Sequence, residues 1–81
     1  MKRKEKLYGI DLLNFAVALT KAKAEEPHLS PKAKAKYRDD VILLKRCCSY
    51  FEREHYSSYN HSLARLSEET RKQFDLSEIC S

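Results

Sequence analysis

The densest group of side chains that could carry chemistry is the stretch KRCCSYFEREHYSSYNH, at residues 45–61. It contains two adjacent cysteines, two histidines, three tyrosines and two glutamates. A structural zinc site needs about four nitrogen or sulfur ligands that converge on one point. Cys48 and His55 would lie two helical turns apart, about 10 Å along the axis, so they cannot bind the same ion. Because only the tertiary structure could add further ligands, such as His61 or Cys80, we predict no metal site and no cofactor.

The same stretch contains the residue types of a cysteine, histidine and glutamate triad, namely Cys48, His55 and Glu52. Glu52 and His55 are close enough on a helix to touch. A nucleophile must also lie within hydrogen-bond reach of its base, and two helical turns separate Cys48 from His55. A single glycine, Gly9, cannot build a glycine-rich phosphate loop. We therefore expect no catalytic residue and no enzymatic activity.

Length and composition favour a small helical domain. A chain of 81 residues forms one domain at most, with a small core. One glycine and two prolines are too few for the turns of an all-β fold, while 35% charged and 42% hydrophobic residues argue against disorder. Three cysteines, two of them adjacent, make no disulfide framework. We expect residues 1–81 to form a single helical domain with a flexible basic tail at residues 1–7.

The N-terminal segment has the outline of a signal peptide, with basic residues before an apolar run. Asp11 and Asn14 interrupt that run, and no small-residue cleavage site follows it. The run from Ile10 to Leu19 is also shorter than the about 20 residues that a membrane-spanning helix requires. The sequence therefore predicts a cytoplasmic protein without membrane contact.

Apolar periodicity predicts two long helices joined by a short loop. The first covers about residues 8–26, and its polar strip is so narrow that we expect cover on several sides, from this chain or from a second subunit. Pro27 ends it, and Ser30 before Pro31 is an N-cap signal. The second helix should run antiparallel to the first, over about residues 31–55. Its predicted core stripe is Ala33, Tyr37, Val41, Leu44, Cys48, Phe51 and His55.

The C-terminal third is less regular in sequence. A polar break at residues 57–60 should precede a third helix over about residues 61–74. Ser67, followed by two glutamates, could instead be a new N-cap that divides this helix in two. Asp75 with Glu78 could form a capping box for a terminal turn. The predicted fold is all-α: an antiparallel helical hairpin plus a shorter third helix, a small three-helix bundle that dimerisation could complete.

We expect first a small non-enzymatic regulatory or interaction protein, such as an inhibitor, that binds a larger protein or itself as a homodimer. The thin polar strip of the first helix favours a subunit contact. Aromatic residues near arginines are enriched at interfaces. The predicted interface comprises Leu12, Phe15, Leu19, Arg46, Tyr50, Arg53, Tyr56 and Tyr59.

The alternative is a nucleic-acid-binding protein, because positive charge is concentrated in the N-terminal half. Residues 1–38 hold ten Lys or Arg and four Asp or Glu, whereas residues 39–81 hold six and eight. Such a patch suits contacts to the phosphate backbone, and lysine lacks the planar fork that reads bases. We therefore expect binding without sequence specificity. The predicted contacts are Lys2, Arg3, Lys4, Lys6, Lys21, Lys23, Lys32, Lys34, Lys36 and Arg38.

Overall fold

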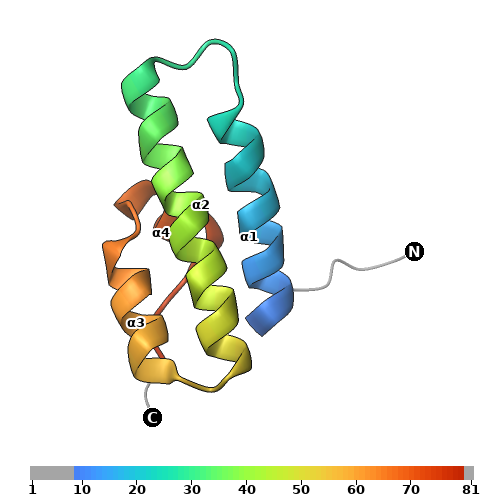
Figure 1. Cartoon of the computed structure of the whole chain (residues 1–81), viewed down its shortest axis with the longest axis vertical. Helices are drawn as coiled ribbons and strands as arrows, with labels where there is room; N and C mark the ends of the chain where they lie inside the picture. The colour runs from blue at the N-terminus through green and yellow to red at the C-terminus, as the bar shows by residue number, and fades with distance from the viewer. Residues whose placement is uncertain (1–8, 80–81) are drawn as a thin grey trace, which may run out of the picture.

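A computed structural model describes residues 9–79, and every regular element in that range is a helix (Figure 1). The helices are α1 (Gly9–Ala24), α2 (Pro31–Glu52), α3 (Tyr56–Arg65) and α4 (Glu68–Phe74). The predicted all-α class is confirmed, with the third helix divided into two. No helix within residues 9–79 combines the length and the apolar character that crossing a bilayer requires. The predicted basic tail, with Lys2, Arg3, Lys4 and Lys6, lies outside the described residues, as does Cys80.

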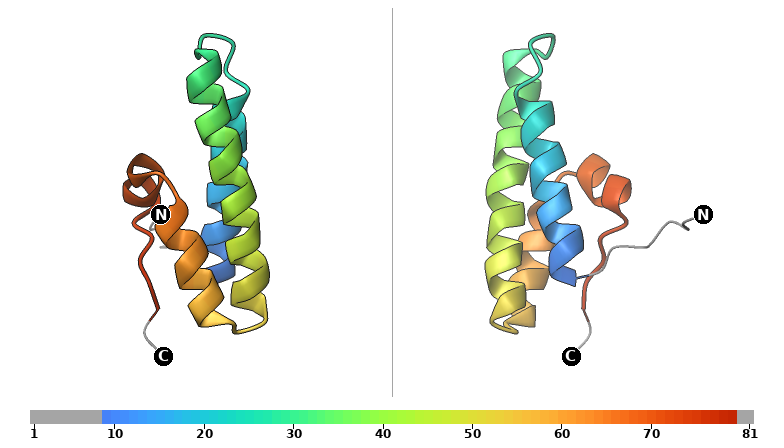
Figure 2. Two further views of the ribbon diagram at one scale, coloured as in Figure 1. Left: turned by 60° about the vertical axis from the view of Figure 1, so that its left-hand side comes forward. Right: turned by 90° about the vertical axis from the view of Figure 1, so that its right-hand side faces the viewer.

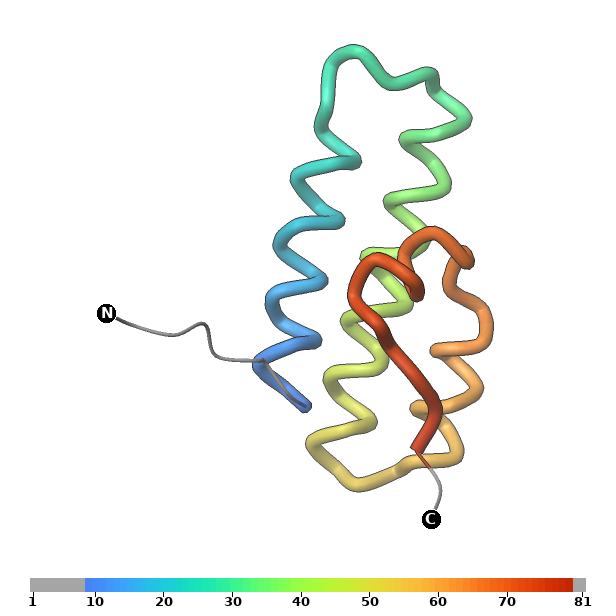
Figure 3. The backbone as a smooth tube through the Cα atoms, turned by 180° about the vertical axis from the view of Figure 1, so that it is seen from behind, coloured from blue at the N-terminus to red at the C-terminus, as the bar shows by residue number. Residues whose placement is uncertain are grey.

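Helices α1 and α2 form an antiparallel hairpin whose loop end projects beyond α3 and α4 (Figures 1 and 3). The predicted N-cap of α2 is confirmed: the Ser30 hydroxyl accepts a hydrogen bond from the Ala33 amide at 3.2 Å. At the other end of the hairpin, Gly9 has a φ of +54°, and a Cβ there would lie 3.1 Å from the Phe51 ring. Both the conformation and the close approach therefore favour glycine at this position.

Helix α2 ends at Glu52, earlier than predicted, and α3 begins almost at once. Glu54 has a φ of 62°, in the left-handed region. The amides of Glu54 and His55 donate to the carbonyls of Phe51 and Tyr50, at 3.1 and 2.9 Å. These bonds form a Schellman motif, which usually has glycine at the left-handed position. Because glutamate stands there instead, the sequence carried no stop signal, and the predicted break at residues 57–60 is wrong.

The residues after helix α4 run back towards the end of the molecule at which α2 and α3 are joined (Figures 2 and 3). Ser67 caps α4 by accepting from the Thr70 amide, which confirms the division predicted as an alternative. The predicted terminal turn is wrong, because Asp75 is the left-handed C-cap of α4 and residues 76–79 form no helix. Instead, the Asn60 side chain exchanges two hydrogen bonds of 2.8 Å with the backbone of Ile79.

The core lies where α1 and α3 cover α2 and where α4 closes the open side. Its buried apolar residues are Leu13, Ala16, Leu44, Cys47, Tyr59, Leu63, Leu66, Phe74 and Leu76. On α2 the buried positions are Tyr37, Asp40, Leu44 and Cys47. The predicted stripe is therefore rotated: Cys48 and Phe51 are only half-buried, and His55 is exposed. The reason is that α2 is covered by two neighbours, so its buried face lies between them.

Candidate binding surfaces

The first candidate surface is the α1 stripe, formed by Leu12, Phe15 and Leu19. Phe15 is 46% exposed and Leu19 is 36% exposed, while Leu12 is half-buried. The Phe15 ring packs against the Phe74 ring, with centroids 6.1 Å apart and planes at 88°. The predicted polar strip of α1 is exposed, as expected. Of the two expected sources of cover for α1, the described part of the chain supplies only part, because Phe15 and Leu19 remain exposed.

The aromatic residues predicted as part of a partner surface are divided by the fold. The Phe51 ring packs against two tyrosines. Its centroid lies 6.0 Å from that of Tyr56 and 5.8 Å from that of Tyr59. Tyr59 is only 5% exposed, and burial raises its pKa. These rings build the contact between α2 and α3, so Tyr59 belongs to the core of the chain. Of the other predicted interface residues, Arg53 is exposed at the α2–α3 turn, whereas Tyr50 and Arg46 line a groove.

Two of the predicted nucleic-acid contacts, Lys23 and Lys36, belong to a group that we call the Glu69 cluster, together with Tyr37. The Lys36 ammonium lies 3.0 Å from one Glu69 oxygen. The Tyr37 hydroxyl donates to the other oxygen at 2.9 Å, and the Lys23 ammonium lies 3.9 Å from it. Both ammonium groups also lie over the Tyr37 ring, 5.4 and 5.2 Å from its centroid. These two lysines therefore already have an anionic partner within the chain.

The hydrogen bonds of the Glu69 cluster shift the pKa values of its members. Bonds from Lys36 and Tyr37 lower the pKa of the Glu69 carboxyl. The same bond to Glu69 raises the pKa of Lys36, and together with burial it raises the pKa of Tyr37. Each shift favours the protonation state found at neutral pH, so the cluster is a stabilising contact between α4 and the hairpin.

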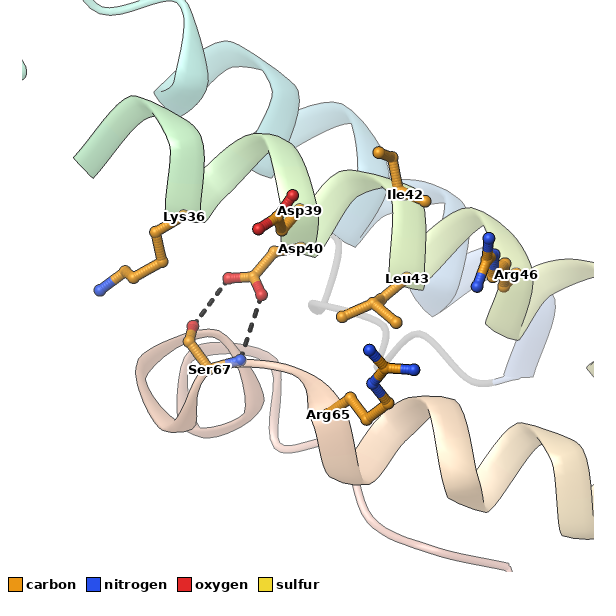
Figure 4. A pocket seen from close by; sticks show the side chains of 8 residues that line it. All are labelled: Lys36, Asp39, Asp40, Ile42, Leu43, Arg46, Arg65 and Ser67. Carbon is orange, nitrogen blue, oxygen red and sulfur yellow. Dashed lines mark hydrogen bonds between the residues drawn. The ribbon is translucent and has the colours of Figure 1, made fainter. Parts of the chain in front are cut away.

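Beside this cluster, a buried carboxylate holds the start of α4 against α2. Asp40 is 2% exposed and accepts three hydrogen bonds, of which Figure 4 shows the two from Ser67. Two come from Ser67, from its amide at 3.1 Å and its hydroxyl at 2.7 Å, and one from the Thr70 hydroxyl at 2.7 Å. Sequence reasoning missed this role, because Asp40 and its exposed neighbour Asp39 look alike in sequence. A carboxylate on an otherwise buried helix face is the only signal that could have found it.

A second candidate surface is the α1–α2 groove, an open hollow of about 380 Å³. Its residues are Lys21, Ala24, Glu25, Arg38, Val41, Ile42 and Lys45. Within residues 9–79, none of its three cations lies within 4.0 Å of a carboxylate. Lys21 and Arg38 were among the predicted nucleic-acid contacts, whereas Lys45 was not. Lys32 and Lys34 lie in the first turn of α2, at the projecting end of the hairpin.

The third candidate surface is the arginine groove between α2 and α3, named for Arg46 and Arg65. It consists of two adjoining hollows of about 380 and 300 Å³ that share Leu43 and both arginines. Figure 4 shows Arg65 rising from α3 towards Leu43. The hollow nearer the α2–α3 turn is completed by Tyr50, Ser57, Ser58, His61 and Ser62. No single motif marked this surface, because its residues come from separate parts of the sequence.

The cysteines and histidines of the opening stretch are separated in space. Cys47 is fully buried, its thiol donates to the Tyr59 carbonyl at 3.9 Å, and burial raises its pKa to about 12. The Cys48 thiol donates to the Asn14 side chain at 3.7 Å, and burial raises its pKa too. Neither thiol is therefore an activated nucleophile. Among residues 9–79, no three His, Cys, Asp or Glu side chains converge where a metal ion could bind.

Comparison of the chain with models of protein families, with curated proteins and with solved structures finds no match. Its function therefore has to be argued from the three surfaces themselves.

Proposed function

We propose that this protein is a small non-enzymatic interaction protein, and that the α1 stripe binds a helix of a protein partner or of a second copy. The observation that carries the proposal is the exposure of Phe15 and Leu19, at 46% and 36%, on successive turns of one helix. Large apolar side chains grouped on one face mark interaction sites. Covering them is favourable by about 25 cal/mol per Å² of apolar surface removed from water.

The neighbours of the α1 stripe suit a helical partner. Ala18 and Ala22 are exposed on the same side of α1 as Phe15 and Leu19. Small side chains beside large ones let a second helix approach closely and place its ridges between those of α1. A homodimer would satisfy this face by pairing α1 with its own copy across a two-fold axis.

The experiment that tests this proposal is Leu19→Glu, which places a charge at one end of the stripe without disturbing a buried side chain. The matched control is Ala35→Glu, at an exposed position of α2. Light scattering over a wide concentration range should show association of the wild type and of the control, and a monomer for Leu19→Glu. If all three chains remain monomers, a pull-down should show a partner lost by Leu19→Glu alone. Equal recovery of partners by all three chains would contradict the proposal.

The second candidate function, binding to a nucleic-acid backbone, is supported by the unpaired cations of the α1–α2 groove. Arg38→Glu with Lys45→Glu should then abolish retardation of DNA or RNA at low salt, and the wild-type affinity should fall steeply as salt rises. Lys36 is a poor probe, because its loss also disturbs the Glu69 cluster. The absence of retardation of any nucleic acid by the wild type would contradict this function.

A further inference from the structure

The arginine groove is lined by hydrogen-bond donors from two helices. In the hollow nearer the α2–α3 turn, Arg46 comes from α2, and Arg65 and His61 come from α3. Ser57, Ser58 and Ser62 add hydroxyl groups, and no residue of this hollow is a carboxylate. We propose that this groove binds the phosphate group of a small phosphate monoester, held between Arg46 and Arg65.

The two arginines border the same space from opposite walls. Both line each of the adjoining hollows, and Leu43 of α2 extends towards Arg65 of α3 (Figure 4). Within residues 9–79, neither guanidinium lies within 4.0 Å of a carboxylate or donates a side-chain hydrogen bond. Two like charges that face one small space repel each other, and an anion placed between them removes that repulsion.

The carboxylates in the adjoining hollow do not neutralise these arginines. Asp40 uses both of its oxygens to accept hydrogen bonds from Ser67 and Thr70. Asp39 is exposed and forms no salt bridge to either arginine. Within residues 9–79 the two forked guanidinium groups therefore form no salt bridge, and no carboxylate lines the hollow nearer the α2–α3 turn. Such forks match the paired oxygens of a phosphate group.

The size of the hollow favours a phosphate carried by a small organic group. About 300 Å³ is more than a bare phosphate needs, and Tyr50 and His61 also line this hollow. The groove is also short, because α3 has 10 residues and so spans about 15 Å. The other hollow, farther from the α2–α3 turn, ends towards α4 at Ser67, which Asp40 holds in place. A small ligand fits these limits better than a polymer that must pass through.

The test uses the full chain labelled with ¹⁵N and titrated at constant ionic strength with phenyl phosphate, with inorganic phosphate or with chloride. The side-chain Nε–H signals of Arg46 and Arg65 should shift saturably with phenyl phosphate. A weaker response to inorganic phosphate would identify an organic monoester as the ligand, and an equal response would identify free phosphate. Shifts no larger than those caused by chloride would overturn the proposal.

Variants separate a built site from general attraction to positive charge. Arg46→Gln and Arg65→Gln should each weaken phosphate binding by about tenfold or more, because each loses a charge-assisted hydrogen bond. Arg38→Gln removes the same charge from the other side of α2 and should change binding by less than about twofold. Arg46→Lys, which keeps the charge but not the fork, should be intermediate. Equal weakening by Arg38→Gln would overturn the proposal.

This inference does not depend on the α1 stripe. Leu19 lies on α1, outside both hollows of the arginine groove. Leu19→Glu should therefore bind phenyl phosphate with unchanged affinity, while the arginine variants should associate like the wild type. Loss of phosphate binding in Leu19→Glu would contradict the assignment of the ligand to this groove.

Discussion

The cations of α2 divide into two groups whose surroundings differ. Lys36, with Lys23 from α1, is paired with Glu69 and covers the Tyr37 ring. Arg46 instead lines a groove together with Arg65 and, within the described residues, has no carboxylate within 4.0 Å. The first group stabilises the contact with α4, whereas the second forms no salt bridge among the described residues. The comparison shows that the fold decides which basic residues are paired within the described part of the chain.

The largest effect on stability is expected from a substitution of Asp40, the buried carboxylate that keeps α4 against α2. Its loss should also displace Glu69, which lies on α4. Asp40→Ala should lower the free energy of unfolding by about 2–4 kcal/mol, because buried donors of Ser67 and Thr70 lose a charged acceptor. Urea denaturation followed by circular dichroism measures this loss. The control is Asp39→Ala, at the exposed neighbour, which should change stability by less than about 0.5 kcal/mol. Equal effects of the two substitutions would show that Asp40 does not anchor α4.

A smaller effect is expected from Glu69→Gln, which should turn the paired lysines into unpaired ones. Glu69 has a lowered pKa in the folded chain. Its contribution to stability is therefore fully present above its ordinary pKa of 4.5 and is lost as the pH falls through the lowered value. Wild type should be more stable than Glu69→Gln at neutral pH, and the difference should vanish in acid.

The contribution of Lys36 and Tyr37 to stability changes with pH in the opposite direction to that of Glu69. The pKa values of Lys36 and Tyr37 are raised from 10.5 and 10.0. Their contribution is present below those values and is lost as the pH rises through the raised ones. Urea unfolding of wild type and Glu69→Gln between acid and strongly basic pH would measure both limits. A difference that persists unchanged in acid would assign the stabilisation to packing instead of charge.

The smallest effect concerns the turn that holds α3, and so Arg65, beside α2. Glu54→Gly should raise the free energy of unfolding by about 0.5–1 kcal/mol, because glycine adopts the left-handed conformation without strain. The matched control is Glu52→Gly in the last turn of α2, where the backbone is helical and glycine should be destabilising. Thermal unfolding of the two variants should move in opposite directions. A shift of both in the same direction would contradict the Schellman geometry.

Local signals in the sequence were sufficient for the starts of α2 and α4, but not for the start of α3 at Tyr56. Ser30 before Pro31 predicted the N-cap of α2, and Ser67 before two acids offered the division that α4 shows. Both caps depend on hydrogen bonds within three residues along the chain. The end of α2 could not be predicted in the same way, because Glu54 occupies a position where glycine would have marked the turn.

The sequence by itself determined an all-helical chain, its hairpin loop and an excess of positive charge near the N-terminus. Only the tertiary structure decided which basic residues of the chain are paired with a carboxylate and which are brought together in a groove. Lys36 and Glu69 are 33 residues apart in sequence, and they meet because Asp40 fixes the start of α4. Arg46 and Arg65 are brought together by the turn at Glu54. Helix caps act between near neighbours and can be read locally, whereas the pairing of charges depends on the packing of distant segments.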